Sequence, residues 1–107
     1  MATGRLGTAN VTTAAQLTTV YTVPANTFTL CSISVCNRGN TDCGIRVALA
    51  AGSSPTDDEW IEYNVDVGGH GVLERTGVLL SAGQKIIVWT GAPNVSVVVY
   101  GVETSTL

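Results

Sequence analysis

The chain is poor in charge, and no part of it is strongly basic. Only 12% of its 107 residues are Asp, Glu, Lys or Arg, against about a quarter in an average globular domain. Because a free soluble protein usually carries more charge than this, we expect part of the surface to be covered by partners. The net charge is −3, and no basic run is interleaved with aromatic residues. Nucleic-acid binding is therefore not expected.

Long apolar runs are also lacking. No stretch reaches the roughly eighteen apolar residues that suggest a transmembrane helix. The N-terminal sequence, Met-Ala-Thr-Gly-Arg-Leu-Gly, has no apolar segment after a basic start and so does not resemble a secretory signal. The sequence predicts no membrane contact and a protein that stays in the compartment where it is made.

Cysteine and histidine are too few and too scattered for a metal site. Three cysteines, at positions 31, 36 and 43, fit poorly with a disulfide framework because their number is odd. Their spacing is not that of a zinc ribbon or finger. We expect three reduced thiols, with Cys31 and Cys43 acting as small core residues. The single histidine, His70, lies among glycines in a predicted turn. We expect no metal and no other cofactor.

No set of residues indicates catalysis. The chain has no Gly-x-Ser-x-Gly motif that would place a serine nucleophile on a sharp turn. Glu62 and Asp66 lie on the polar side of a predicted strand, where solvated acids are common. Thr56 to Glu59 has the Thr-x-x-Glu form of a capping box, which predicts either a helical turn, of one turn at most, or a solvated acidic rim. The sequence therefore predicts a protein that is not an enzyme.

What the chain does contain is short stretches with strand-like alternation, separated by clusters of Gly, Pro and Asn. This pattern predicts about seven to eight strands in a single antiparallel β-sandwich, of jelly-roll or immunoglobulin-like type. The sandwich is expected over residues 16–107, after an extended N-terminal arm over residues 1–15. The predicted strands cover residues 16–23, 28–36, 43–49, 60–67, 72–80, 85–90 and 95–103.

Two of these strands look like a hairpin around which the rest of the chain is arranged. Apolar residues alternate with polar or small ones from 31 to 35 and again from 43 to 49. Pairing Val35 with Cys43 and Ile33 with Ile45 would place both apolar sets on one face.

Alternation also predicts the faces of the later strands. In residues 60–67, one face is expected to hold Ile61, Tyr63, Val65 and Val67, and the other Trp60, Glu62, Asn64 and Asp66. Within residues 85–90 the four positions 86–89 are apolar, and so are residues 97–99. Consecutive apolar positions are typical of strands buried on both faces.

Four residues are candidates for subunit contacts. Trp60 and Trp89 are either core residues or anchors at a contact, where tryptophan is enriched. Arg5 and Leu6 lie on the predicted arm, which is either a free end or a strap over a neighbouring subunit. In a third interpretation, an exposed Trp60 or Trp89 stacks on a sugar beside Asn64 and Asp66.

The order of several segments resembles small β-sandwich virion proteins of tailed bacteriophages, including those of cyanobacteria. The resemblance covers roughly residues 5 to 103. The segments that carry it are Val-Tyr-Thr-Val-Pro-Ala (20–25), Val-Cys-Asn-Arg-Gly (35–39), Ile-Arg-Val-Ala-Leu-Ala (45–50), Pro-Thr-Asp-Asp-Glu-Trp-Ile-Glu-Tyr (55–63), Gly-Val-Leu-Glu-Arg-Thr-Gly-Val-Leu-Leu-Ser-Ala-Gly-Gln-Lys-Ile (71–86) and Val-Ser-Val-Val-Val-Tyr-Gly (95–101).

The resemblance implies a structural part of the virion, made in the host cytoplasm. We expect a capsid decoration (cement) protein that forms a dimer or trimer and bridges subunits of the major capsid protein. The alternatives are a tail, baseplate or fibre-attachment protein, and a carbohydrate-binding module used in adsorption. The resemblance supplies no catalytic motif and no site residues.

Overall fold

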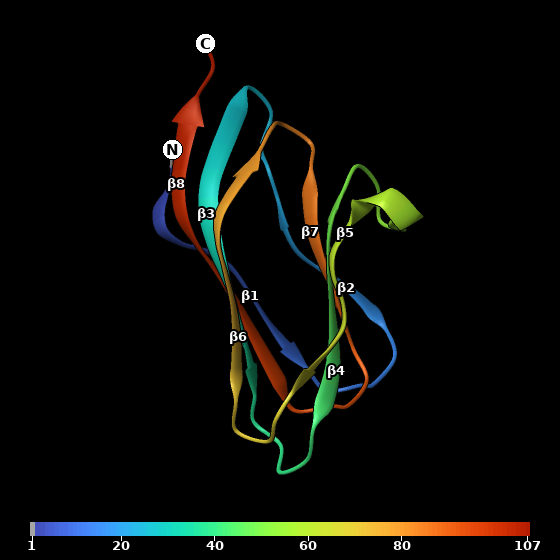
Figure 1. Cartoon of the computed structure of the whole chain (residues 1–107). Coiled ribbons are helices and arrows are strands. Elements are labelled where there is room, and N and C mark those ends of the chain that lie inside the picture. The colour runs from blue at the N-terminus through green and yellow to red at the C-terminus, as the bar shows by residue number, and fades with distance from the viewer. Residues whose placement is uncertain (1) are drawn as a thin grey trace.

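A computed structural model describes residues 2–107, which form two four-stranded antiparallel sheets packed face to face (Figure 1). The first sheet has the order β1 (Thr3–Val11), β8 (Val95–Ser105), β3 (Thr27–Asn37) and β6 (Val72–Leu80). The second has the order β2 (Leu17–Thr22), β7 (Lys85–Thr90), β4 (Cys43–Ala50) and β5 (Trp60–Val67). A 3₁₀ turn, η1 (Asp57–Glu59), precedes β5. No helix in this part of the chain is long and apolar enough to span a membrane.

The connections between strands define the topology. Every connection crosses from one sheet to the other except β4 to β5, which are neighbours in the second sheet. Eight strands in two such sheets, wound as two Greek keys, are the arrangement of a jelly roll. The predicted single antiparallel β-sandwich is thus confirmed, and the strand order favours the jelly roll over the immunoglobulin-like form.

The predicted hairpin between residues 31–36 and 43–49 is wrong. β3 pairs with β8 and β6, whereas β4 pairs with β7 and β5, so Ile33 lies opposite Val99 and Ile45 lies opposite Val65. The turn after β3 crosses between the sheets. The alternating residues are nevertheless buried as predicted, except Leu49, which is half-buried against the core. Alternation could not reveal the pairing, because strands side by side and strands facing each other across a core bury the same residues.

The main core lies between the two sheets. It is built from aliphatic side chains with almost no exposed surface, among them Ile33, Val35, Ile45, Val47, Leu80, Ile86, Val88, Val95, Val97 and Val99. A smaller cluster of Ala48, Ala50 and Ile87 lies on the outer side of the second sheet, under Trp60. β7 is therefore buried on both faces, as predicted. In β8 the inward Val97 and Val99 are buried, but the outward Val98 is only half-buried and the outward Tyr100 and Val102 are exposed, so the prediction of burial on both faces fails for this strand.

The N-terminal segment is extended, as predicted, but it does not project as an arm. From Thr3 to Val11 it is an edge strand on β8, with a bulge between Arg5 and Gly7. At Gly7 the strand passes so close to β2 that a Cβ atom would lie 2.5 Å from the carbonyl oxygen of Val20. Leu6, near the bulge, packs against the core.

A polar contact joins the two sheets at one end of the core. The Tyr21 hydroxyl on β2 donates to Glu103 Oε2 on β8 at 2.5 Å and lies 2.8 Å from the Thr29 hydroxyl on β3. Burial and the bond to Glu103 raise the pKa of Tyr21 to about 12. The same bond lowers the pKa of the Glu103 carboxyl. The contact therefore favours an ionised Glu103 beside a neutral Tyr21.

A second polar contact holds the turn that crosses between the sheets. The buried side chain of Asn37 donates through Nδ2 to the carbonyl oxygens of Thr41 at 2.8 Å, Val67 at 3.0 Å and Gly68 at 3.3 Å. Its Oδ1 accepts from the N–H of Gly39 at 3.0 Å. The amide thus ties the turn after β3 to the end of β5 at the point where the chain leaves the first sheet.

Candidate binding surfaces

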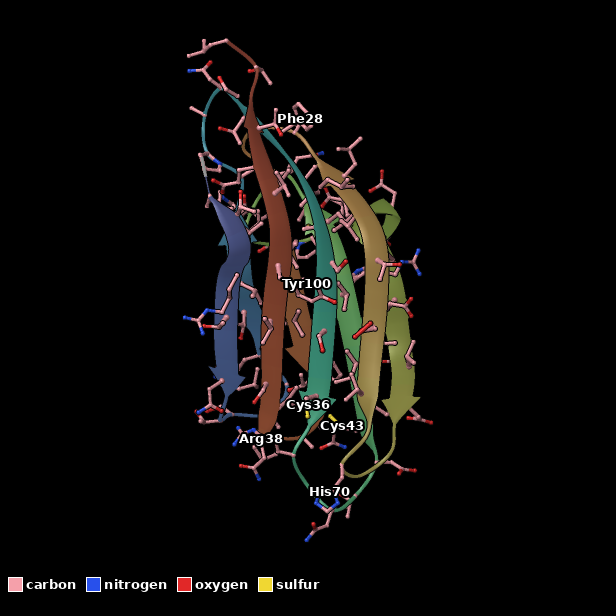
Figure 2. The ribbon with its side chains drawn as sticks, turned by 90° about the vertical axis from the view of Figure 1, so that its left-hand side faces the viewer. Phe28, Cys36, Arg38, Cys43, His70 and Tyr100 are labelled. Atoms are coloured by element: carbon pink, nitrogen blue, oxygen red, sulfur yellow. The ribbon has the colours of Figure 1, made fainter. Side chains whose placement is uncertain are left out.

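The outward side of the first sheet carries a group of exposed apolar residues. Leu30 on β3 lies opposite Leu79 on β6 and Val102 on β8, so the three form a row across the sheet. Their exposed fractions are 51%, 65% and 46%. Phe28 and Tyr100, also exposed, extend the group along β3 and β8 (Figure 2). We call these five residues the apolar face.

No charged side chain points outward from the two central strands of the first sheet. The outward positions of β3 and β8, which include four residues of the apolar face, alternate with the buried ones. They are Phe28, Leu30, Ser32, Ser34, Cys36, Ser96, Val98, Tyr100, Val102 and Thr104. Charge enters only on the edge strands, for example at Arg5 and Glu74, both exposed.

The beginning of β3 has its polarity reversed. Thr27 and Thr29 face the interior with at most 1% of their surface exposed, while Phe28 and Leu30 face outward. The buried hydroxyls are satisfied, since Thr27 donates to the Ala25 carbonyl and Thr29 contacts the Tyr21 hydroxyl. A strand whose outer side faces only solvent would normally place apolar residues inward and polar residues outward.

The outward side of the second sheet carries a different surface, which we call the aromatic cluster: Arg46, Trp60, Tyr63 and Trp89. The Arg46 guanidinium carbon lies 4.3 Å from the centroid of the Tyr63 ring and 4.1 Å from that of Trp89. Such distances are typical of cation–π contacts. Tyr63 also meets Trp60 edge to face, with 5.6 Å between centroids and 74° between ring planes. The four side chains therefore support one another.

A bulge in β5 creates this cluster. The pairing of β5 with β4 shifts register between Ile45 and Ala48, and Asn64 adopts a φ of 55°. An extra residue in one strand moves the side chains next to it to the opposite face of the sheet. Asparagine is one of the few residues that readily adopt the left-handed conformation seen at Asn64. Tyr63, predicted to share the inward face of Ile61, is instead 56% exposed and contacts Trp60. The predicted face assignment is wrong for Tyr63, and also for Glu62, which lies opposite the buried Val47 and forms a 2.7 Å ion pair with Arg75 on β6.

An open pocket of about 490 Å³ lies beside the cluster and is lined by Asp57, Trp60 and Tyr63. The predicted helical turn is present as η1, which lies on the outer side of the second sheet (Figure 1). Glu59 secures the turn by accepting backbone N–H bonds from Thr56 at 2.9 Å and Ala51 at 3.0 Å. These bonds lower the pKa of the Glu59 carboxyl.

The four predicted contact residues lie in three different environments. Trp60 and Trp89 are both half-buried on the outer side of the second sheet, linked through Tyr63 and Arg46. Arg5 is exposed on the first sheet, next to Tyr100 in the pairing, whereas Leu6 packs on the core. The structure thus brings together the two tryptophans and separates both from Arg5.

The sequence analysis missed Tyr63, Arg46 and the apolar face. For the apolar face a signal was present, because Phe28 and Leu30 alternate with threonines and could have been tested as an outward set. For Tyr63 no signal was present, since its orientation depends on the bulge at Asn64.

The remaining reactive groups do not form a site. Within residues 2–107, no three His, Cys, Asp or Glu side chains are grouped to hold a metal ion. Cys31 and Cys43 are buried, as predicted, and all three thiols are free. Burial raises the pKa of the Cys31 thiol to about 11, which makes it a poor nucleophile at neutral pH. His70 is exposed in the turn between β5 and β6.

Comparison with known proteins finds no matching family, no matching curated protein and no matching solved structure.

Proposed function

We propose that this chain is a structural protein of a phage particle: a capsid decoration protein that docks its apolar face on the assembled shell. The observation that carries the proposal is the reversed polarity at the start of β3. The Thr27 and Thr29 hydroxyls are hydrogen-bonded, so the unfavourable part of this arrangement, for a sheet that faces water, is the exposure of Phe28 and Leu30. The arrangement becomes favourable when a partner covers the outer side.

The apolar face is large enough to contribute useful binding energy. Full burial of one large apolar side chain stabilises by about 1.5 to 3 kcal/mol. With the five residues of the face about half exposed, covering them would contribute on the order of 5 kcal/mol before the cost of association. This suits weak individual sites repeated over a shell, where avidity strengthens attachment. Binding only to the assembled lattice would then stabilise it by mass action.

Three further observations support the proposal. The low charge suits a protein packed among subunits. The order of several segments along the sequence resembles that in phage virion proteins. Jelly rolls occur in viral capsid proteins, although a fold alone does not define a function.

The partners proposed are the major capsid protein and further copies of this chain, in a dimer or trimer. A tail, baseplate or fibre-attachment protein is the alternative, because the same uncharged surface would serve a tail contact. Copy number separates the two, since a shell component is present in hundreds of copies and a tail component in a few to dozens.

The proposal is tested by quantitative mass spectrometry of purified particles. We expect hundreds of copies of the wild-type chain and a loss of most of them for the double variant Leu30→Ser/Leu79→Ser. A matched control is Tyr63→Ser, which removes an exposed apolar residue from the opposite sheet and should leave the copy number unchanged. Absence of the chain from particles would refute the proposal, and a few to dozens of copies would favour the tail alternative.

A further inference from the structure

The pocket beside the aromatic cluster has the form of a small-ligand site. Trp60 and Tyr63 give it two aromatic walls at 74° to each other, and Asp57 adds a carboxylate. Its volume is about 490 Å³ and it is open to solvent. Ligand pockets usually measure about 300 to 1,000 Å³, so a ligand of ordinary size would lie against the walls with one side exposed. Aromatic surface with a few convergent polar groups is the composition expected of such a site.

Both aromatic walls are held in place without a ligand. Trp60 packs against the buried cluster of Ala48, Ala50 and Ile87 and also lines the pocket. Tyr63 is held by the stacked guanidinium of Arg46, whose Nε donates to Asn64 Oδ1 at 2.6 Å. The Arg46 guanidinium also stacks on the ring of Trp89, which helps to hold it in place. A site ordered in advance loses less entropy on binding.

The charges around the pocket select the class of ligand. Asp57, Asp58 and Glu59 form the turn at its rim, so an anionic ligand would meet like charges. The Arg46 guanidinium on the ring of Tyr63 makes a second cation there unfavourable for the same reason. A neutral ligand with an apolar face and several hydroxyl groups satisfies both conditions.

We propose that this pocket binds a neutral saccharide, with a pyranose ring stacked on Trp60 and its hydroxyl groups donating to the Asp57 carboxylate. Hydrogen bonds to a charged acceptor are stronger than those between neutral groups. The geometry differs from the sequence-based interpretation, which used Asn64 and Asp66. Here Asn64 Oδ1 is occupied by Arg46, and Trp89 supports Arg46 and does not line the pocket.

The saccharide site is independent of the shell-docking proposal. The apolar face belongs to the first sheet. The turn η1 lies on the outer side of the second sheet (Figure 1) and supplies Asp57 to the pocket. A copy that docks through the first sheet would present the pocket to the surrounding medium. Saccharide binding by the isolated chain can therefore be measured without particles, and its failure would leave the docking proposal unaffected.

The test begins with an array of neutral, sialylated and amino-sugar oligosaccharides probed with the purified chain. The best neutral oligosaccharide on the array is then titrated in solution and followed by tryptophan fluorescence. We expect binding confined to neutral glycans, and an affinity lowered about tenfold or more by Tyr63→Ala and by Asp57→Ala, a loss of at least about 1.4 kcal/mol. Both residues are exposed, so the variants should fold. Leu79→Ser, on the opposite sheet, should bind as the wild type does.

Three results would overturn the proposal. The first is a wild-type chain that binds no neutral glycan on the array. The second is displacement of the bound glycan by tetramethylammonium chloride at equal concentration, which would identify the pocket as a cation site. The third is an affinity unchanged in both Tyr63→Ala and Asp57→Ala, which would place any sugar binding elsewhere.

Discussion

Replacing Asn37 with leucine, a side chain of similar size, tests how the chain crosses between the sheets. The change removes two donor hydrogens that serve three carbonyl oxygens, and one acceptor for the Gly39 N–H. With an average net contribution of about 1 kcal/mol for each of the two donor hydrogens and the one acceptor, the loss in the free energy of unfolding is about 3 kcal/mol. The carbonyl and N–H groups left without partners could raise the loss in the free energy of unfolding to about 5 kcal/mol.

The loss is measured by urea denaturation followed through the fluorescence of Trp60 and Trp89. With a slope of about 1.5 to 2 kcal/mol per molar urea, a loss of 3 kcal/mol lowers the midpoint by roughly 1.5 to 2 M. Asn37→Asp removes the donor hydrogens while keeping the shape of the side chain. It keeps an acceptor for the Gly39 N–H but places a carboxylate beside three carbonyl oxygens. We expect Asn37→Asp to be at least as destabilised as Asn37→Leu at pH 7.

A matched control lies in the same turn. Asn40 is exposed, so Asn40→Asp should change the free energy of unfolding by no more than about 0.5 kcal/mol. The reasoning is refuted if Asn37→Leu loses less than 1 kcal/mol, or if Asn40→Asp loses as much as Asn37→Asp. Either result would mean that the buried amide does not hold the turn.

Three further predictions concern the contact between the sheets, a close approach of strands, and the apolar face. Tyr21→Phe should cost about 1 to 2 kcal/mol. Folding lowers the pKa of Glu103 through the bond to Tyr21. The stability that ionised Glu103 contributes is therefore present above the pKa of a free glutamate and is lost as the pH falls through the pKa of the folded protein. In urea titrations from pH 3 to 7, Tyr21→Phe should show a smaller loss of stability with acid than the wild type. Gly101→Ala would place a Cβ atom inside contact distance of the Leu30 carbonyl and should lower the free energy of unfolding by about 1 to 3 kcal/mol, whereas an unchanged midpoint would show that the strands can separate there. Leu30→Ser/Leu79→Ser should change the unfolding of the isolated chain by no more than about 1 kcal/mol, because both side chains face outward, and a larger loss would mean that they belong to the core.

The fold could be predicted from the sequence to the extent that it depends on local alternation. Cys31, Ile33 and Val35 are buried as their spacing indicates, and Thr56 to Glu59 forms the expected turn. The pairing of β3 could not be predicted in this way, because its neighbours come from the end of the chain and from β6. Which strands pair depends on the packing of the whole sandwich and not on any one segment.

The candidate sites depended on features with weak local signals. Trp60 and Trp89 were identified by residue type, and they do lie on the same outer surface. Tyr63 joins them only because the bulge at Asn64 reverses its facing. The residues 1–15, small and polar, lacked the alternation of a core strand, yet β1 pairs with β8 because an edge strand needs backbone partners more than apolar side chains.

Cryo-electron microscopy of the intact particle tests most directly whether a partner covers the first sheet. We predict density for this chain on the shell, with Leu30, Leu79 and Tyr100 against a neighbouring subunit and the pocket at Trp60 facing the medium. Density with the first sheet exposed to solvent and the second against the shell would contradict the proposed docking, and so would particles without density for this chain.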